Sequence, residues 1–259
     1  MSSSTLAQTL LDEPELVAGY IGFPIPELCF TRMELLVQNL RDNVPEHQGR
    51  LYSQVVLDLV DESLATFFIG PMDDIGISPM GEKVVRAGVT SVKKAVGVLV
   101  STLGKKLTNK EMMPLAEYLW GVVYIDEDKD DPRQNAYMAS PINSALDRDL
   151  TQIILDIEAG ETGASIEERL IATLLNVSDI ALYIFFAKPL ELLQLGLVMR
   201  KASQMAYEGT RAAIRGVIKK VFKGMGEQEL RGVAKYIRQV RFSQERFQVV
   251  GDRVAEDLT

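Results

Sequence analysis

The stretch VVRAGVTSVKKAVGVLVSTL, residues 84–103, decides the fold class at the level of sequence. Its apolar side chains recur at the spacing of a helix, although valine is common in strands. The positions that keep this spacing are Val85, Val89, Val92, Val96, Leu99 and Leu103. We therefore expect a helix with one buried face here, in spite of the β-branched composition.

Two other segments share one series of apolar positions, at offsets of 0, 4, 7 and 11 residues. The series is formed by Cys29, Met33, Leu36 and Leu40, and again by Leu146, Leu150, Ile153 and Ile157. Thr108 followed by Glu111, and Ser165 followed by Glu168, have the spacing of capping boxes at helix starts. Sustained alternation of apolar and polar residues, which is the signal of a half-buried strand, is scarce.

These signals predict an all-α fold, a multi-helix bundle of about nine or ten mostly antiparallel helices with no sheet. The expected helices cover roughly residues 4–20, 26–43, 46–69, 80–104, 109–124, 142–158, 165–187, 189–223, 227–241 and 243–250. No repeat with a period of 20–50 residues is found, which argues against a solenoid. We expect a single all-α domain over residues 1–259, with a possible seam at 126–135 between two packed helical halves.

The chain has one cysteine, Cys29, and one histidine, His47. These counts exclude an intrachain disulfide, a CxxC redox pair and any metal site built on several cysteines or histidines. Neither of the common phosphate-binding loops, GxxxxGK[ST] and GxGxxG, occurs. The sequence therefore implies no cofactor and favours a protein without catalytic activity. Residues 1–11 do not resemble an export signal, so the expected location is cytoplasmic.

An acidic cluster at residues 126–131 is the best candidate for a divalent metal site. Its proposed ligands are Asp126, Asp128 and Asp130. The cluster does not fit an EF-hand, because Asp131 stands where glycine is needed and Tyr137 where glutamate is needed. A magnesium-dependent enzyme that uses this cluster is one alternative function, and a solvated acidic loop is the plain structural alternative.

The net charge of −8 is unevenly distributed, because residues 200–246 hold twelve Lys or Arg against four acids. On the expected helices these bases form a basic stripe, which consists of Arg211, Arg215, Lys219, Lys223, Arg231, Lys235, Arg238 and Arg241. Such a stripe suits an acidic protein partner or an anionic membrane surface, to which a peripheral membrane protein would bind through residues 200–246. The alternative is that the bases face the protein's own acidic helices. The negative net charge argues against nucleic acid as a partner.

Residues 170–205 are more apolar than a surface helix requires, and a break is expected at Pro189. They are expected to line an apolar pocket or interface formed by Tyr183, Phe185, Phe186, Leu193, Leu197 and Met199. Plain core packing is the alternative. Asp179 lies within this run and must be paired if it is buried.

The sequence thus predicts a cytoplasmic, non-catalytic helical protein that binds an apolar small molecule or a protein partner. The membrane-surface and magnesium-enzyme hypotheses are the two alternatives. Small residues at four-residue spacing, Ala87, Ser91 and Ala95, also permit a homodimer through close helix packing.

Overall fold

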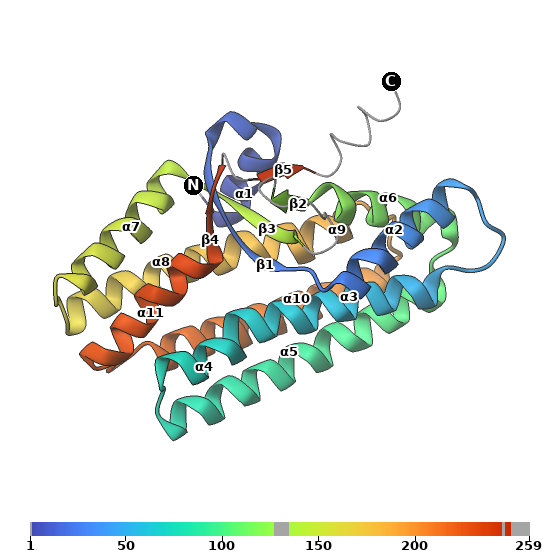
Figure 1. Ribbon diagram of the computed structural model, residues 1–259. Helices are drawn as coiled ribbons and strands as arrows, with labels where there is room; N and C mark the ends of the chain where they lie inside the picture. The colour runs from blue at the N-terminus through green and yellow to red at the C-terminus, as the bar shows by residue number, and fades with distance from the viewer. Residues whose placement is uncertain (1, 127–134, 245–246, 250–259) are drawn as a thin grey trace.

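The computed structural model describes residues 2–126, 135–244 and 247–249, and Figure 1 shows its arrangement. Helices make up most of the described chain, as expected. They are α1 (Ser3–Asp12), α2 (Glu27–Arg41), α3 (Gly49–Leu64), α4 (Gly70–Ile75), α5 (Pro79–Lys106), α6 (Asn109–Gly121), α7 (Ser144–Glu158), α8 (Ala164–Leu182), α9 (Lys188–Glu191), α10 (Leu197–Val221) and α11 (Glu227–Val240). Two π-helices, η2 (Ala65–Ile69) and η4 (Tyr183–Ala187), join α3 to α4 and α8 to α9.

The prediction of a fold with no sheet is wrong. Within the described residues, five strands form one antiparallel sheet in the order β4-β1-β3-β2-β5. The strands are β1 (Val17–Pro24), β2 (Val123–Asp126), β3 (Ala136–Asn143), β4 (Arg241–Ser243) and β5 (Phe247–Val249). In Figure 1 the sheet lies above the long helices α3, α5 and α10, and α1 lies on its other side.

The strands escaped prediction because the sheet is covered on both faces. Ile21 and Phe23 of β1 belong to the main core, whereas Tyr20, which precedes Ile21 and points to the other face, packs with Leu10 of α1 and Tyr124 of β2 in a second cluster. Strands buried on both sides carry apolar residues on both faces, so the alternation that identifies a half-buried strand is lost.

Most predicted helices are confirmed within a few residues, and the exceptions have local causes. The segment 4–20 ends as a helix at Asp12, ahead of a short 3₁₀ turn that begins at Pro14 and leads into β1. The segment 243–250 contains strand residues of β4 and β5. The capping box at Thr108 is confirmed, but α8 begins after Gly163 without a side-chain cap.

The chain is not broken at Pro189, contrary to the prediction. The helical path continues from α8 through η4 into α9, and Pro189 lies in the first turn of α9, where its missing N–H costs little. The interruption falls instead at 192–196, before α10 begins.

The structure shows an internal duplication that the sequence patterns had not revealed. Moving α2 along the chain by 117 residues gives the bounds of α7, since Glu27 becomes Ser144 and Arg41 becomes Glu158. A shift of 118 residues relates the later elements, because η2 becomes η4 and the first residues of α5, α6 and β2 become those of α10, α11 and β4. The element order β1-α2-α3-η2-α4-α5-α6-β2 is thus repeated as β3-α7-α8-η4-α9-α10-α11-β4.

The two halves are joined by exchanging strands. The first strands of the two halves, β1 and β3, pair in the middle of the sheet, and each last strand pairs with the first strand of the other half. In Figure 1 the equivalent helices α2 and α7 lie on opposite sides of this central pair. The long helices α5 and α10, which are also equivalent, pack against each other beneath it.

Glycines permit the closest helix contacts. A Cβ at Gly104 of α5 would lie 2.1 Å from Ser53 Oγ and 2.5 Å from Gly49 O, both on α3. A Cβ at Gly88 would lie 2.4 Å from Val217 Cγ2 of α10. Larger residues at these positions would force the helices apart.

One stretch in the described chain, Ala164–Glu191, has the length and composition of a membrane-spanning helix, with a mean hydropathy of 1.9 over its most apolar window. It contains α8, η4 and α9, which pack in the structure against α7, α10 and α1. In its most apolar window, 44% of the residues are buried within the fold.

Candidate functional site: an apolar cavity between the two halves

A cavity of about 260 Å³ lies between the sheet and the helices of both halves. Its wall is formed by side chains of β1, α3, η2, α5, α8, η4, α10 and α11, with further contributions from α4 and α7. Apart from three hydroxyl-bearing aliphatic residues and one tyrosine, the lining consists of apolar residues. Its apolar members include Ile21, Phe23, Val92, Val96, Ala181 and Ile214.

Each of the two π-helices contributes two phenylalanines to this wall. Phe67 and Phe68 come from η2, and Phe185 and Phe186 come from the equivalent positions of η4. The ring of Phe23 lies between the two sets, with its centroid 6.0 Å from that of Phe67 and 6.3 Å from that of Phe185. Both contacts are edge-to-face, which is a favoured geometry for aromatic pairs. Single π-helical turns are frequent at functional sites.

The first π-helix leaves one carbonyl without a backbone donor. The N–H of Gly70 donates to Ala65 O, five residues earlier. The next carbonyl, that of Thr66, would take the N–H of Pro71, which proline lacks. The hydroxyl of Tyr236, on α11 of the other half, donates to Thr66 O and replaces the missing group.

The second π-helix repeats this arrangement. The N–H of Lys188 donates to Tyr183 O, and Pro189 has no N–H for Ile184 O. The hydroxyl of Tyr118, which is equivalent to Tyr236, donates to Ile184 O at 2.9 Å. Each half thus satisfies the open carbonyl of the other half's π-helix, which holds both phenylalanine pairs at the cavity.

Four polar side chains reach the wall: Ser63, Ser178, Thr210 and Tyr236. The hydroxyls of Ser63 and Ser178 donate to carbonyls of their own helices, at 2.9 Å and 3.0 Å. Thr210 is 2% exposed, and its Oγ1 has no hydrogen-bond partner among the described residues. No charged residue is part of the wall that the structure describes.

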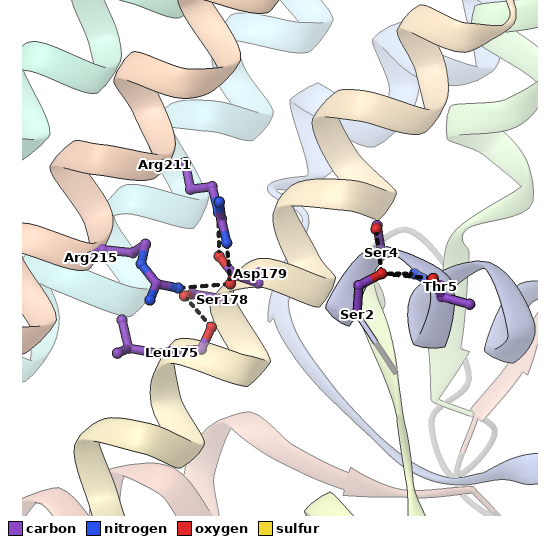
Figure 2. Close-up of polar contacts among 8 residues, drawn as sticks. All are labelled: Ser2, Ser4, Thr5, Leu175, Ser178, Asp179, Arg211 and Arg215. Carbon is purple, nitrogen blue, oxygen red and sulfur yellow. Dashed lines mark hydrogen bonds and ion pairs between the residues drawn. The ribbon is translucent and has the colours of Figure 1, made fainter. Parts of the chain in front are cut away.

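An ion-pair cluster stands beside the cavity, next to Ser178. Figure 2 shows Arg211 and Arg215 of α10 reaching the carboxylate of Asp179 on α8. Arg211 donates twice, at 2.8 Å, and Arg215 once, at 2.7 Å. These hydrogen bonds raise the pKa of Arg211 and provide the pairing that a buried Asp179 requires.

The duplication extends to this cluster. Asp61 and Lys93, the equivalents of Asp179 and Arg211, form an ion pair of 3.0 Å in the first half. The first pair is exposed, whereas the Asp179 side chain is only 7% exposed. The buried cluster of Asp179, Arg211 and Arg215 thus links α8 to α10 along one edge of the cavity.

Two of the six residues predicted to line the pocket are part of the cavity wall. Phe185 and Phe186 line the cavity. Tyr183 is buried beside it, and its hydroxyl donates to Gln8 Oε1 at 2.8 Å. The other three, Leu193, Leu197 and Met199, are not part of the wall, and Leu197 is 70% exposed.

Five members of the predicted basic stripe form ion pairs, although three of these, Arg211, Arg231 and Arg238, are also exposed. Arg211 and Arg215 bind Asp179, Arg231 binds Glu227, Arg238 binds Glu158 and Arg241 binds Asp147. Lys219, Lys223 and Lys235 are exposed. Binding of an acidic partner or an anionic membrane by this stripe stays a prediction.

The predicted metal site lies mostly outside the described residues. Asp128 and Asp130 are not described, and Asp126 is fully buried at the end of β2, where its N–H donates to Asn135 O. The proposed seam at 126–135 also lies largely outside the described chain. Among the described residues, no group of three or more His, Cys, Asp or Glu is placed to hold a metal.

No protein-family model, no curated protein and no solved structure matches the chain.

Sequence reasoning placed the pocket in the second half alone and missed the equivalent wall from the first. A signal was present, since FFIGP at 67–71 and FFAKP at 185–189 share the pattern FFxxP. The two segments are related by the same shift of 118 residues as the π-helices that contain them.

Proposed function

We propose that the protein binds an uncharged, apolar small molecule in the cavity between its two halves. The observation that carries the proposal is the cavity of about 260 Å³ with its almost wholly apolar wall. An apolar cavity of about 150 Å³ is large enough to take benzene. Since benzene has six non-hydrogen atoms, a cavity of about 260 Å³ has room for a ligand of about ten.

Occupation of the cavity would also stabilise the fold. An apolar ligand that fills the cavity removes apolar surface from water, at about 25 cal/mol per Å². Filling even part of the space with a matching apolar ligand therefore supplies a substantial driving force for binding.

The composition of the wall limits the class of ligand. An ionised group in an apolar cavity without a partner loses its hydration and gains nothing in return. Arg211 and Arg215, which lie on α10 beside the cavity, bind Asp179 and are not part of the wall. These features support a neutral ligand and make the cavity a better candidate site than the basic stripe.

The test uses naphthalene as a probe and one substitution that fills the cavity. Ala181 of α8 lines the cavity, and Ala181→Phe places a ring in it. Ala172 is exposed on the same helix, so Ala172→Phe is the matched control. Thermal unfolding of each variant is followed with and without naphthalene, and native mass spectrometry reports any molecule that co-purifies.

At a naphthalene concentration of about 100 times Kd, binding adds about 2.7 kcal/mol, which raises Tm by about 5–11 °C in a chain of this size. We expect this rise in the native protein and in Ala172→Phe, and its loss in Ala181→Phe. An equal rise in all three proteins would place binding elsewhere. Absence of a rise in the native protein, together with absence of any co-purified molecule, would refute the proposal.

A further inference from the structure

The cavity extends further between α8 and α10 than between the equivalent helices α3 and α5. Four wall residues at this end, here called the rim, are Leu174, Val177, Val221 and Phe222. Their equivalents in the first half, which are not among the described residues of the wall, are Val56, Leu59, Leu103 and Gly104. The two halves therefore contribute unequally to the cavity, in spite of the duplication.

A pair of glycines accounts for this difference. Gly49 of α3 and Gly104 of α5 lie so close together that a Cβ on either one would overlap the backbone of the other. The equivalent positions of the second half hold Glu167 of α8 and Phe222, which directly follows α10. The distance between two packed helices depends on the side chains at their contact. These larger residues therefore keep α8 and α10 apart at the place where α3 and α5 meet.

The cavity reaches the surface at the rim, because all four rim residues are partly exposed. Val60 and Ser63 of α3 are wall residues that are also partly exposed. The wall residues of the facing helix α5, which include Val92 and Val96, are however buried. Those of β1, α4 and α7 are buried as well. Among the described helices, α8 and α10 are thus a packed pair in which both members present apolar wall residues to solvent.

Two polar links join the chain across this opening. Toward one end, Arg211 and Arg215 of α10 donate to the carboxylate of Asp179 on α8, as Figure 2 shows. At the other end, the N–H of Gly224, just after α10, donates to Glu167 Oε2 of α8 at 2.8 Å. The rim lies between the two links along both segments. Separation of α8 from α10 would therefore have to break one link or the other.

We infer that the apolar ligand enters and leaves the cavity between α8 and α10, and that the Asp179 cluster limits how often this opening widens. The inference rests on the proposed function, because it concerns the exchange of the same ligand. An apolar rim offers no polar barrier to an apolar molecule. The step that limits exchange is then the local separation of the two helices, and such openings are slower than side-chain motions.

The cluster acts on the rate of exchange and not on the affinity. Asp179, Arg211 and Arg215 are not part of the wall, so they do not contact a ligand inside the cavity. Three hydrogen bonds between charged groups, at 2.7–2.8 Å, favour the closed arrangement whether or not a ligand is present. Weakening them should raise the association and dissociation rates by the same factor.

The test measures the exchange of naphthalene. NMR exchange spectroscopy gives the dissociation rate, calorimetry gives Kd, and the association rate follows from their ratio. Asp179→Asn weakens the cluster, and Gly104→Ala is its control, because it destabilises the equivalent helix contact of the first half. Leu174→Trp narrows the opening from the rim. Its control is Val56→Trp, at the equivalent position outside the described wall.

We expect Asp179→Asn to raise both rates about ten-fold without a change in Kd, which corresponds to about 1.4 kcal/mol in favour of opening. Leu174→Trp should lower the association rate several-fold. Gly104→Ala and Val56→Trp should exchange naphthalene at the native rates.

Native exchange rates in both Asp179→Asn and Leu174→Trp, or an equal acceleration in Gly104→Ala, would overturn the inference and leave the proposed function standing. Leu174→Trp retains the cluster, so it decides the question if Asp179→Asn does not fold. Failure of the native protein to bind naphthalene, with no co-purified molecule, would remove the proposed function and the inference together.

Discussion

Replacement of Tyr118 by phenylalanine tests how the π-helices are held at the cavity. The Tyr118 hydroxyl donates to Ile184 O, whose expected backbone donor is absent because residue 189 is proline. Tyr118→Phe keeps the ring and removes only that donor. If the tyrosine replaces the missing N–H, the variant leaves a carbonyl of η4 without a partner.

The expected cost follows from the hydrogen-bond geometry and the surroundings. A buried polar group that loses its partner costs about 1–3 kcal/mol. Tyr118 is partly buried, and this burial raises the pKa of its hydroxyl. We therefore expect a loss of about 2 kcal/mol, or a fall in Tm of about 4–8 °C for a chain of this length.

A double-mutant cycle with Pro189→Ala makes the test specific. Alanine restores an N–H five residues after Ile184, where a π-helical bond to Ile184 O can form. The loss caused by Tyr118→Phe should then shrink to well under 1 kcal/mol. Free energies of unfolding come from urea titrations, with constant m-values required for comparison. Tyr207→Phe is the control, since Tyr207 packs on Phe186 of η4 and its hydroxyl has no hydrogen bond within the described chain.

An equal cost of Tyr118→Phe in both backgrounds would mean that the hydroxyl and the proline do not act on the same carbonyl. A loss as large in Tyr207→Phe would show that removal of any tyrosine hydroxyl near η4 has this effect.

Three further predictions concern packing, charge and reactivity. Gly104→Ala should cost about 1–3 kcal/mol because its Cβ would overlap α3, whereas Gly97→Ala on the same helix, with open space around it, should stabilise by about 0.5–1 kcal/mol; urea unfolding compares them. Asp179→Asn should cost about 2 kcal/mol and Asp61→Asn, at the exposed equivalent pair, under about 1 kcal/mol, and similar values would contradict the difference in burial. Burial raises the pKa of the Cys29 thiol to about 12, so it should stay protonated and resist iodoacetamide at pH 8 until urea unfolds the chain; rapid labelling of the folded protein would refute this.

The sequence was sufficient for the helices and insufficient for the sheet. The spacing of Val85, Val89 and Val92 is a local property of one helix, and it survives in the structure as the buried face of α5. The strands β1 and β3 are recognisable only from their partners, because apolar residues on both faces follow from a cover of helices on both sides. Long-range pairing of this kind leaves no periodic signal in either strand.

The candidate site could be predicted only in part, because its wall is built from segments that lie far apart in the sequence. Phe185 and Phe186 stood out within a long apolar run, whereas Phe67 and Phe68 lie in a shorter apolar run that follows the polar residues Asp61–Ser63. What brings the four together is the association of the two halves, which depends on strand exchange and on tyrosine contacts between distant residues. The sequence required a partner for a buried Asp179 and allowed the bases to face acidic helices, but it did not identify Arg211 and Arg215 as the partners of Asp179.

Strand exchange has a consequence for the order of events on the ribosome. The strands β1 and β2 of the first half do not pair with each other, since β3 lies between them in the sheet. At typical rates of synthesis, β1 waits roughly 10 s for β3 and about as long again for β4. During that interval the apolar segment Val17–Pro24 presents unpaired backbone groups on both of its edges. This nascent strand is therefore the segment that most needs protection by a chaperone before the chain is complete.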